Sequence, residues 1–361
     1  MKGQTKYQIQ PEILEFMRKS SGMTEDEVAK KLKLPKNKYL RIEDGDEPIS
    51  QNELVHIADI YKRPLIAFYS AEVTKVPEMP HDYRLNRDKK LSSEVFFAKR
   101  KALYLAEQLK EITGRKTTLP EINTNISAIE LAEKMRNILE IDFNFLKELK
   151  DEPILSYYKS LIEEKFFIPI IEHSLKTNGV RAFSVFSEVC VMVLNESDSN
   201  EVKLFSLFHE FCHLLKRQDG ICTVDIEKDK NNQPEEKYCD EFAANVAMPE
   251  DALRNSIQEP ISTFVQVEKI ARAFGVSKQV AIIRLKEFRL IDHRKFNAFK
   301  SKLQSAKKPS FGRRNWERTF VNRTSRLVLS YLLDSFRKGD LTYTSLSTIT
   351  GIKDKYLQKL I

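Results

Sequence analysis

His209, Glu210 and His213 fall inside the segment FSLFHEFCHLLKR, whose apolar residues are typical of a helix. Residues four apart on a helix are about 400° apart, so the two imidazoles lie within about 40° of one another on one face. Two such imidazoles can bind one divalent ion, and zinc accepts them at about 2.0 to 2.1 Å. Glu210 can reach a water beside the metal. The spacing predicts one Zn2+ per chain, with His209 and His213 as ligands and Glu210 as the general base.

Chance is a poor explanation of this spacing. With six histidines in the chain, a His-Glu-x-x-His sequence should arise in fewer than about one random chain in a hundred. The leucines and phenylalanines around it predict a largely buried helix, in which two histidines and a glutamate are costly unless something pairs with them. A metal ion supplies that partner.

A catalytic zinc needs a third protein ligand and one open position. A third histidine six residues after the second is absent, but the segment PEEKYCDEFAANVAMPE predicts a second helix that begins at Pro234. We expect Glu236 on this helix to be the third ligand, and Asp240 one turn later to orient a ligand histidine. Glu235 is the alternative ligand, and both glutamates could instead serve only the positive end of the helix dipole. No residue can be assigned to stabilise the oxyanion.

The segment before the histidine helix predicts a small sheet. SYYKSLIEEKFFIPIIE has the pattern of a helix that runs into a strand, and VRAFSVFSEVCVMVLN has the pattern of two short strands rich in Val and Phe. We expect a strand edge within residues 181–195, where an extended substrate backbone could pair.

The N-terminal region predicts short helices with two defined starts. Thr24 with Glu27, and Ser50 with Glu53, each form a capping-box pattern. Between them we expect a tight turn and a short helix over residues 36–44.

Residues 11–69 resemble the XRE-type helix-turn-helix domain of phage-repressor-like regulators. The residues at framework positions are Val28, Ala29, Leu34, Arg41, Ile42, Glu43 and Gly45. The resemblance implies a five-helix domain with candidate DNA contacts at Lys36, Asn37, Lys38 and Arg41. A protein-docking or autoregulatory role is the alternative, because Glu25 stands where that family usually presents a glutamine and residues 1–69 hold 12 basic and 11 acidic side chains.

Residues 180–290, together with this N-terminal region, resemble the ImmA/IrrE family of metallopeptidases. The family motifs are His-Glu-x-x-His and Glu-x-x-Ala-(Asn or Asp)-x-Phe-Ala followed by Met-Pro. The second motif is matched by Glu236, Asp240, Phe242, Ala243, Met248 and Pro249, with Cys239 in place of the alanine. The resemblance implies a gluzincin-like zinc endopeptidase that cleaves a repressor-like transcriptional regulator. Such enzymes are often encoded on mobile elements or act in stress responses.

The positive charge of the chain is concentrated near the C-terminus. Residues 284–361 contain 19 Lys and Arg against 6 Asp and Glu, so the net charge of +8 divides into +13 there and −5 elsewhere. Helix-turn-helix patterns occur around Gly275 and Gly351. For the first we expect a helix pair that packs on the catalytic unit; for the second, a nucleic-acid surface and a solvated basic face are equally open.

These observations predict a mainly α, multidomain protein. We expect an XRE-type domain (1–70), a helical connector (71–151), a small α+β zincin-like core (152–256), a helix-turn-helix-like pair (257–295) and a basic helical region (296–361). The first residues contain no apolar core typical of a signal peptide, no apolar run is long enough to cross a bilayer, and Cys190, Cys212, Cys222 and Cys239 show no metal-finger spacing. We therefore expect a cytoplasmic protein with reduced thiols and no membrane partner. The competing hypothesis is a DNA-binding regulator or antitoxin-like protein whose zinc is structural or sensory.

Overall fold

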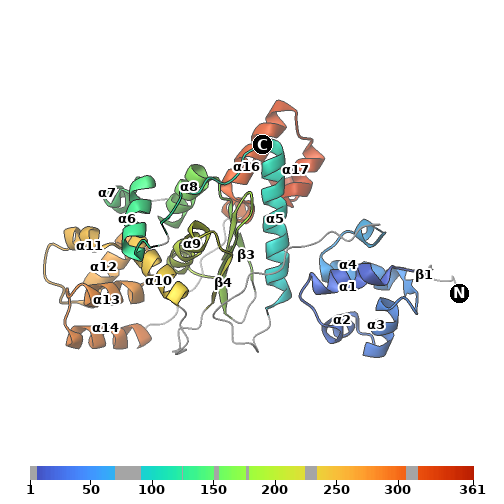
Figure 1. The fold of residues 1–361 in the computed structure, drawn as a ribbon, viewed down its shortest axis with the longest axis horizontal. Coiled ribbons are helices and arrows are strands. Elements are labelled where there is room, and N and C mark those ends of the chain that lie inside the picture. The colour runs from blue at the N-terminus through green and yellow to red at the C-terminus, as the bar shows by residue number, and fades with distance from the viewer. Residues whose placement is uncertain are drawn as a thin grey trace. The chain divides into compact units, whose positions relative to one another are not determined.

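The computed structural model describes residues 6–69, 91–123, 125–149, 154–175, 179–223, 234–305 and 316–361. These residues are mainly helical and include one small mixed sheet (Figure 1). They divide into two compact units: 6–69, 91–101 and 175 belong to the first, and the other described residues belong to the second. Among the helices of the described residues, none has the length and apolar character needed to span a membrane.

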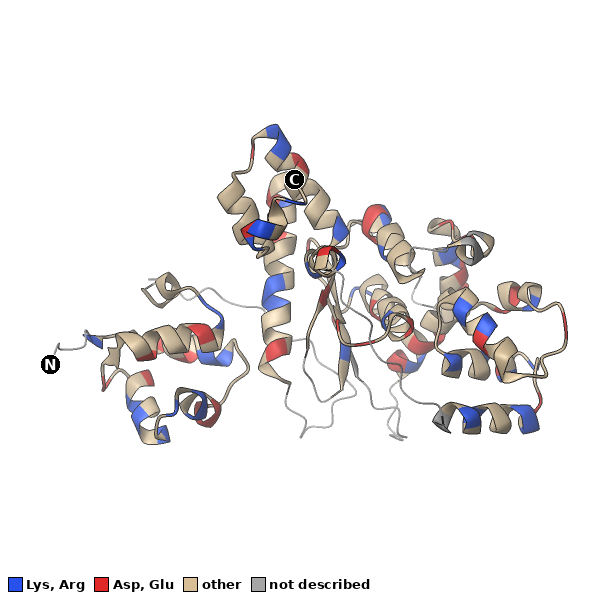
Figure 2. Ribbon diagram, turned by 180° about the vertical axis from the view of Figure 1, so that it is seen from behind, with Lys and Arg blue, Asp and Glu red and all other residues tan. Residues whose placement is uncertain are grey.

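Residues 6–69 of the first unit form four α-helices and a closing 3-10 helix, where five helices were expected. Both predicted capping boxes are confirmed: the side chains of Thr24 and Ser50 accept from the backbone N–H of Glu27 and Glu53, and each glutamate binds back to its N-cap. Residues 6–69 hold 11 basic and 11 acidic side chains, and Figure 2 shows the two kinds interspersed. The elements are β1 (Lys6–Tyr7), α1 (Pro11–Lys19), α2 (Glu25–Leu32), α3 (Lys36–Glu43), β2 (Ile49–Ser50), α4 (Gln51–Tyr61) and η1 (Leu65–Tyr69).

The sheet of the second unit has the strand order β3-β5-β4-β6, with β3 parallel to β5 and the other pairs antiparallel. Its strands are β3 (Ile170–His173), β4 (Val180–Val185), β5 (Val191–Asn195) and β6 (Gly220–Thr223). The expectation of a strand edge within residues 181–195 was wrong, because β4 and β5 each have strands on both sides. Among the described strands, β3 and β6 are at the edges, and α15 (Trp316–Thr324) packs against β3.

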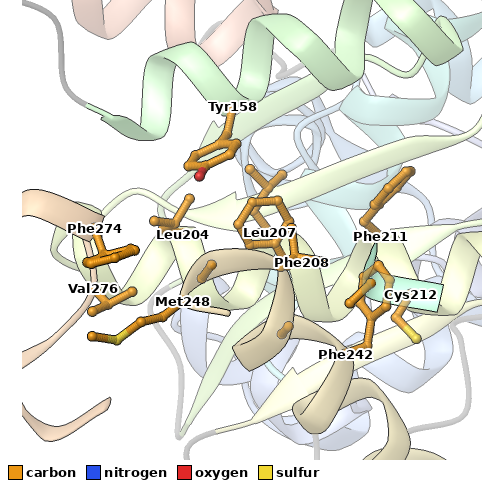
Figure 3. Packing of buried hydrophobic residues seen from close by; sticks show 14 of the residues in the cluster. Tyr158, Leu204, Leu207, Phe208, Phe211, Cys212, Phe242, Met248, Phe274 and Val276 are labelled. Carbon is orange, nitrogen blue, oxygen red and sulfur yellow. The ribbon is translucent and has the colours of Figure 1, made fainter. Parts of the chain in front are cut away.

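Two helices carry the residues predicted to bind metal and pack against one another: α9 (Asn200–Leu215) and α10 (Pro234–Ala247). α9 also packs on β4, so it is covered on most sides and its residues from Leu207 to Leu215 are all buried. Figure 3 shows Leu207, Phe208 and Phe211 of α9 in the apolar cluster that also holds Phe242 of α10. Tyr158 packs edge-on against Phe208, with ring centroids 4.9 Å apart.

Helix α6 (Ala128–Ile138) lies in the stretch expected to form a connector, and it packs on α10. Leu131, Ala132 and Met135 are buried in the same apolar cluster as residues of α9 and α10. α6 therefore supports the helix that carries Glu236.

Six of the remaining helices contribute residues to the same apolar cluster. Helices flank Gly275 and Gly351 as expected, and the two glycines end α12 and α17 in the left-handed conformation, with φ of 67° and 66°. The bounds are α5 (Ser93–Thr113), α7 (Phe143–Glu148), α8 (Ile154–Phe166), α11 (Glu250–Ser256), α12 (Phe264–Phe274), α13 (Lys278–Glu287), α14 (His293–Ser305), α16 (Arg326–Lys338), α17 (Tyr343–Thr350) and α18 (Asp354–Leu357).

Candidate metal centre

His209 and His213 on α9 meet Glu236 on α10 in a buried cluster. The exposed fractions of the three residues are 0%, 2% and 2%, and their ligand atoms all lie within 4.8 Å of one another. The two Nε2 atoms are 3.2 Å apart. Glu236 Oε2 is 3.2 Å from His209 Nε2, and Oε1 is 3.4 Å from His213 Nε2. Ligands at about 2.0 to 2.1 Å from one tetrahedral ion lie about 3.3 to 3.4 Å apart, so the spacing of this cluster fits zinc.

The structure separates the two glutamates that the sequence left as alternatives. Glu235 is directed to Lys216, with Oε1 3.9 Å from Nζ, and its side chain is 40% exposed. Glu236 is one helix position further, on the face of α10 that packs against α9. The packing of α10 on α9 therefore brings Glu236, and not Glu235, to the histidines.

The groups around His213 favour a positive charge at this position. Burial by itself would lower the pKa of His213, but the Cys239 thiol and the carboxylates of Glu236 and Glu210 raise it to about 9. A buried site with this surplus of acceptors is stable only if it holds positive charge. A proton on the imidazole supplies one such charge, and a divalent ion supplies two.

Asp240 contacts one of the candidate ligands. Its Oδ1 is 2.9 Å from Nδ1 of His209, while Nε2 of the same ring is directed to Glu236. A proton on Nδ1 is donated to the carboxylate, so Nε2 keeps the lone pair that a metal needs. Asp240 thus has the geometry expected of a residue that orients His209.

Glu210 is fully buried beside the cluster but does not belong to the set of three ligands. Ser184 of β4 donates a hydrogen bond of 2.7 Å from Oγ to Glu210 Oε2. The other oxygen, Oε1, is buried and has no hydrogen-bond partner. A carboxylate held on one oxygen and open on the other is suited to accept a proton.

Gly220, the first residue of β6, makes room for this arrangement. A Cβ atom at position 220 would lie 2.5 Å from Cδ2 of His213 and 2.7 Å from Oε2 of Glu210. Gly220 is also the cross-strand partner of Ser184. Sequence reasoning missed both residues, because only the pairing of β4 with β6 brings them to the site and no local pattern reports that pairing.

Comparison with known protein families finds a match for the region that contains this cluster. Residues 163–286 match the family model described as the IrrE N-terminal-like domain, Peptidase_M78. The match covers about a third of the chain and includes β3 to β6, α9 and α10. It supports the ImmA/IrrE resemblance and a peptidase-type function for this region. No curated protein sequence matches the chain.

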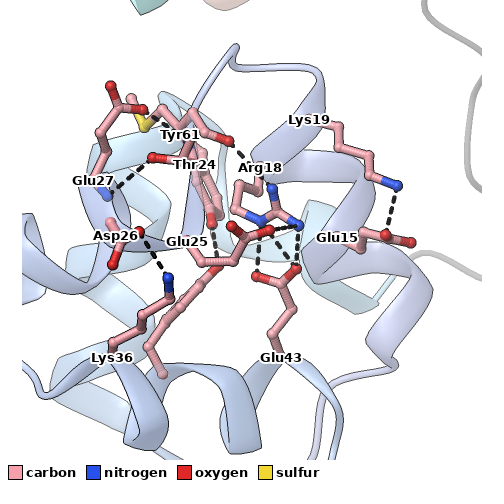
Figure 4. A network of polar contacts seen from close by, with 12 residues as sticks. Glu15, Arg18, Lys19, Thr24, Glu25, Asp26, Glu27, Lys36, Glu43 and Tyr61 are labelled. Atoms are coloured by element: carbon pink, nitrogen blue, oxygen red, sulfur yellow. Dashed lines mark hydrogen bonds and ion pairs between the residues drawn. The ribbon is translucent and has the colours of Figure 1, made fainter.

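The four candidate DNA contacts lie on α3, and Asn37 is exposed there. Each cation of this helix is paired with a carboxylate of its own unit. The pairs are Lys36 with Asp26 at 2.7 Å, Lys38 with Glu53 at 2.8 Å and Arg41 with Glu47 at 2.9 Å. Figure 4 shows Lys36 reaching Asp26, and beside it the buried guanidinium of Arg18 between Glu25 and Glu43. A phosphate would have to displace these partners, which reduces the attraction of α3 for a polyanion.

Proposed function

We propose that the chain is a zinc-dependent endopeptidase of the ImmA/IrrE type, and that it acts on a protein substrate. The observation that carries the proposal is the buried set of His209, His213 and Glu236, whose atoms are spaced for one tetrahedral ion. Glu210 lies next to this set with an oxygen free to accept a proton. A structural zinc site has no use for such a carboxylate, whereas hydrolysis requires one.

Each residue would have a defined part in peptide hydrolysis. His209, His213 and Glu236 would hold the zinc ion, with Asp240 orienting His209. When bound, zinc supplies Lewis acidity, which makes water acidic enough to attack near neutral pH and polarises a carbonyl group. Glu210 Oε1 takes the proton of the attacking water and later gives it to the leaving amine nitrogen. The three protein ligands leave a fourth position for substrate.

We expect the substrate to bind in an extended conformation along β6. This strand begins at Gly220, directly beside Glu210 and His213, and among the described residues its outer edge has no strand partner. Backbone hydrogen bonds at such an edge position a peptide with little demand on its side chains. The inference that the substrate is a repressor-like regulator rests on the family resemblance alone.

Elemental analysis combined with a cleavage assay tests the proposal. Purified wild-type protein should contain one zinc per chain, and His213→Ala should lose it. Glu210→Gln should keep the metal but cleave a library of internally quenched peptides at least about 100-fold more slowly. Equal zinc content in wild-type protein and His213→Ala would show that the ligands are misassigned. Normal cleavage by Glu210→Gln would exclude Glu210 as the base.

A second candidate function is DNA binding. The observation that favours it lies near the C-terminus and not in α3. Lys353, Lys355 and Lys359 at the C-terminus are exposed. Lys355 and Lys359 lie over the rings of Tyr356 and Trp316, whose centroids are 4.8 Å apart. Cations beside aromatic rings are a common feature of nucleic-acid surfaces.

A mobility-shift titration across salt concentrations compares the two regions. Neutralising the three C-terminal lysines together should weaken DNA binding and reduce its salt dependence, because fewer counterions are released. The matched triple change in α3, Lys36→Gln with Lys38→Gln and Arg41→Gln, should have little effect. The reverse pattern would assign DNA binding to the N-terminal unit.

A further inference from the structure

Ser184 is a buried polar residue of the central strand β4, and it makes a short hydrogen bond to the carboxylate beside the metal centre. It is 0% exposed, and its Oγ lies 2.7 Å from Oε2 of Glu210. A hydroxyl that donates to an ionised carboxylate forms one of the stronger hydrogen bonds in proteins. The bond crosses from the sheet to α9, so it ties the general base to a rigid element that is not its own helix.

The neighbours of Ser184 on the sheet leave space for this contact. Ala182 lies two residues earlier on the same face of β4, and Gly220 is paired with Ser184 on β6. Because these residues are small, α9 can approach the sheet closely enough for a serine to reach Glu210. A larger side chain at position 220 would meet the same oxygen, Oε2.

We propose that Ser184 is a positioning residue, which holds Oε2 of Glu210 so that Oε1 alone exchanges protons with water and with the leaving amine. This inference rests on the proposed peptidase function. The Ser184 hydroxyl keeps its own proton throughout: it donates to Oε2 whether Oε1 is bare or protonated. Its contribution is therefore to the orientation of the carboxylate, which matters because misplacing a catalytic group by about 1 Å can cost about 100-fold in rate.

The test compares Ser184→Ala with Ser184→Cys, whose thiol has a similar shape but is a weak donor. Ser206→Ala is the matched control, because Ser206 is also a buried serine of the same unit, with an exposed fraction of 1%. Zinc content and thermal unfolding show whether each variant is folded and loaded. We expect Ser184→Ala to lower kcat roughly 10- to 100-fold on the quenched peptides, with KM within about twofold of wild type, and Ser184→Cys to fall between the two.

A second readout does not depend on turnover. A small hydroxamate chelates zinc and passes its hydroxyl proton to a neighbouring carboxylate, so its dissociation constant reports the position of Glu210. For zinc-loaded Ser184→Ala this constant should rise about tenfold, toward that of Glu210→Gln, while Ser206→Ala should match wild type.

The outcomes separate this inference from the proposed function. If the wild type binds zinc and hydroxamate but cleaves no peptide, the peptidase proposal fails, and Ser184 is judged on hydroxamate affinity alone. If the wild type cleaves and Ser184→Ala has the same kcat and the same hydroxamate affinity, the positioning role is excluded. A loss of zinc from Ser184→Ala would also overturn it, because the residue would then act on the ligands.

Discussion

Replacing Gly220 by alanine should damage the metal centre while leaving the fold intact. The added Cβ would lie 2.5 Å from Cδ2 of His213 and 2.7 Å from Oε2 of Glu210. Ordinary contacts of this kind are about 3.5 Å or longer, so the imidazole has to move by about 1 Å and the carboxylate by slightly less. Zinc–nitrogen distances tolerate only about 0.2 Å of error, so the ligand cannot stay in place.

We expect the zinc affinity of Gly220→Ala to fall about 10- to 100-fold, the range seen when residues that support a ligand are altered. That loss corresponds to about 1.4 to 2.7 kcal/mol. Cleavage at saturating zinc should fall by about 100-fold as well, because Glu210 is displaced too. A competition titration with a zinc chelator measures the affinity, and the quenched peptides measure the rate.

Gly351→Ala is the control for a glycine replacement that does not reach the site. Gly351 has a φ of 66°, and a Cβ added there would meet nothing within 4 Å, so alanine costs about 1 kcal/mol of backbone strain and should leave zinc affinity unchanged. Gly220→Ala should therefore lose zinc affinity, whereas Gly351→Ala should lose about 1 kcal/mol of stability and keep its zinc affinity. Wild-type zinc affinity and kcat in Gly220→Ala would refute the proposed closeness of β6 to His213 and Glu210.

Three further predictions concern stability. Arg18→Met should reduce the free energy of unfolding of the first unit by about 3 to 5 kcal/mol, because it leaves buried Glu43 without its ion-pair partner. In denaturant unfolding, the double variant Arg18→Met with Glu43→Leu should recover most of this loss. A loss below about 1 kcal/mol in the single variant would contradict the prediction. Glu163→Gln should lower the free energy of unfolding by about 1 to 3 kcal/mol, because an amide has one acceptor oxygen where the carboxylate has two. Buried Glu163 accepts hydrogen bonds from the N–H groups of Ile170 and Leu327 and from the hydroxyl of Ser325. Amide exchange in α16 should then accelerate, and unchanged exchange would refute a role of Glu163 in holding the start of α16. Burial would raise the pKa of Glu53, but bonds from Lys38 and Ser50 outweigh it and lower the pKa from 4.5 to about 2. Its stabilisation of α4 is thus present above about pH 4.5 and lost as pH falls toward 2. The protection factors of the α4 amides, corrected for the intrinsic exchange rate at each pH, should therefore fall over that window in wild type and not in Glu53→Gln; equal pH dependence in both would argue against it.

The sequence by itself determined the features that depend on neighbours along one helix. His209 and His213 share a face because they are four residues apart, and Glu236 and Asp240 share a face of their helix for the same reason. The capping boxes at Thr24 and Ser50 are equally local, since each closes within three residues. Such patterns are readable because helix geometry converts a sequence separation directly into a direction in space.

The tertiary structure decided everything that joins separate elements. It brought Glu236, and not Glu235, to the histidines, placed β4 and β5 inside the sheet and not at its edge, and brought Ser184 and Gly220 to Glu210. It also supplied Glu53 and Glu47 as partners for the cations of α3. These outcomes depend on strand order and helix packing, which are set by the burial of the whole apolar core and not by any short stretch of residues.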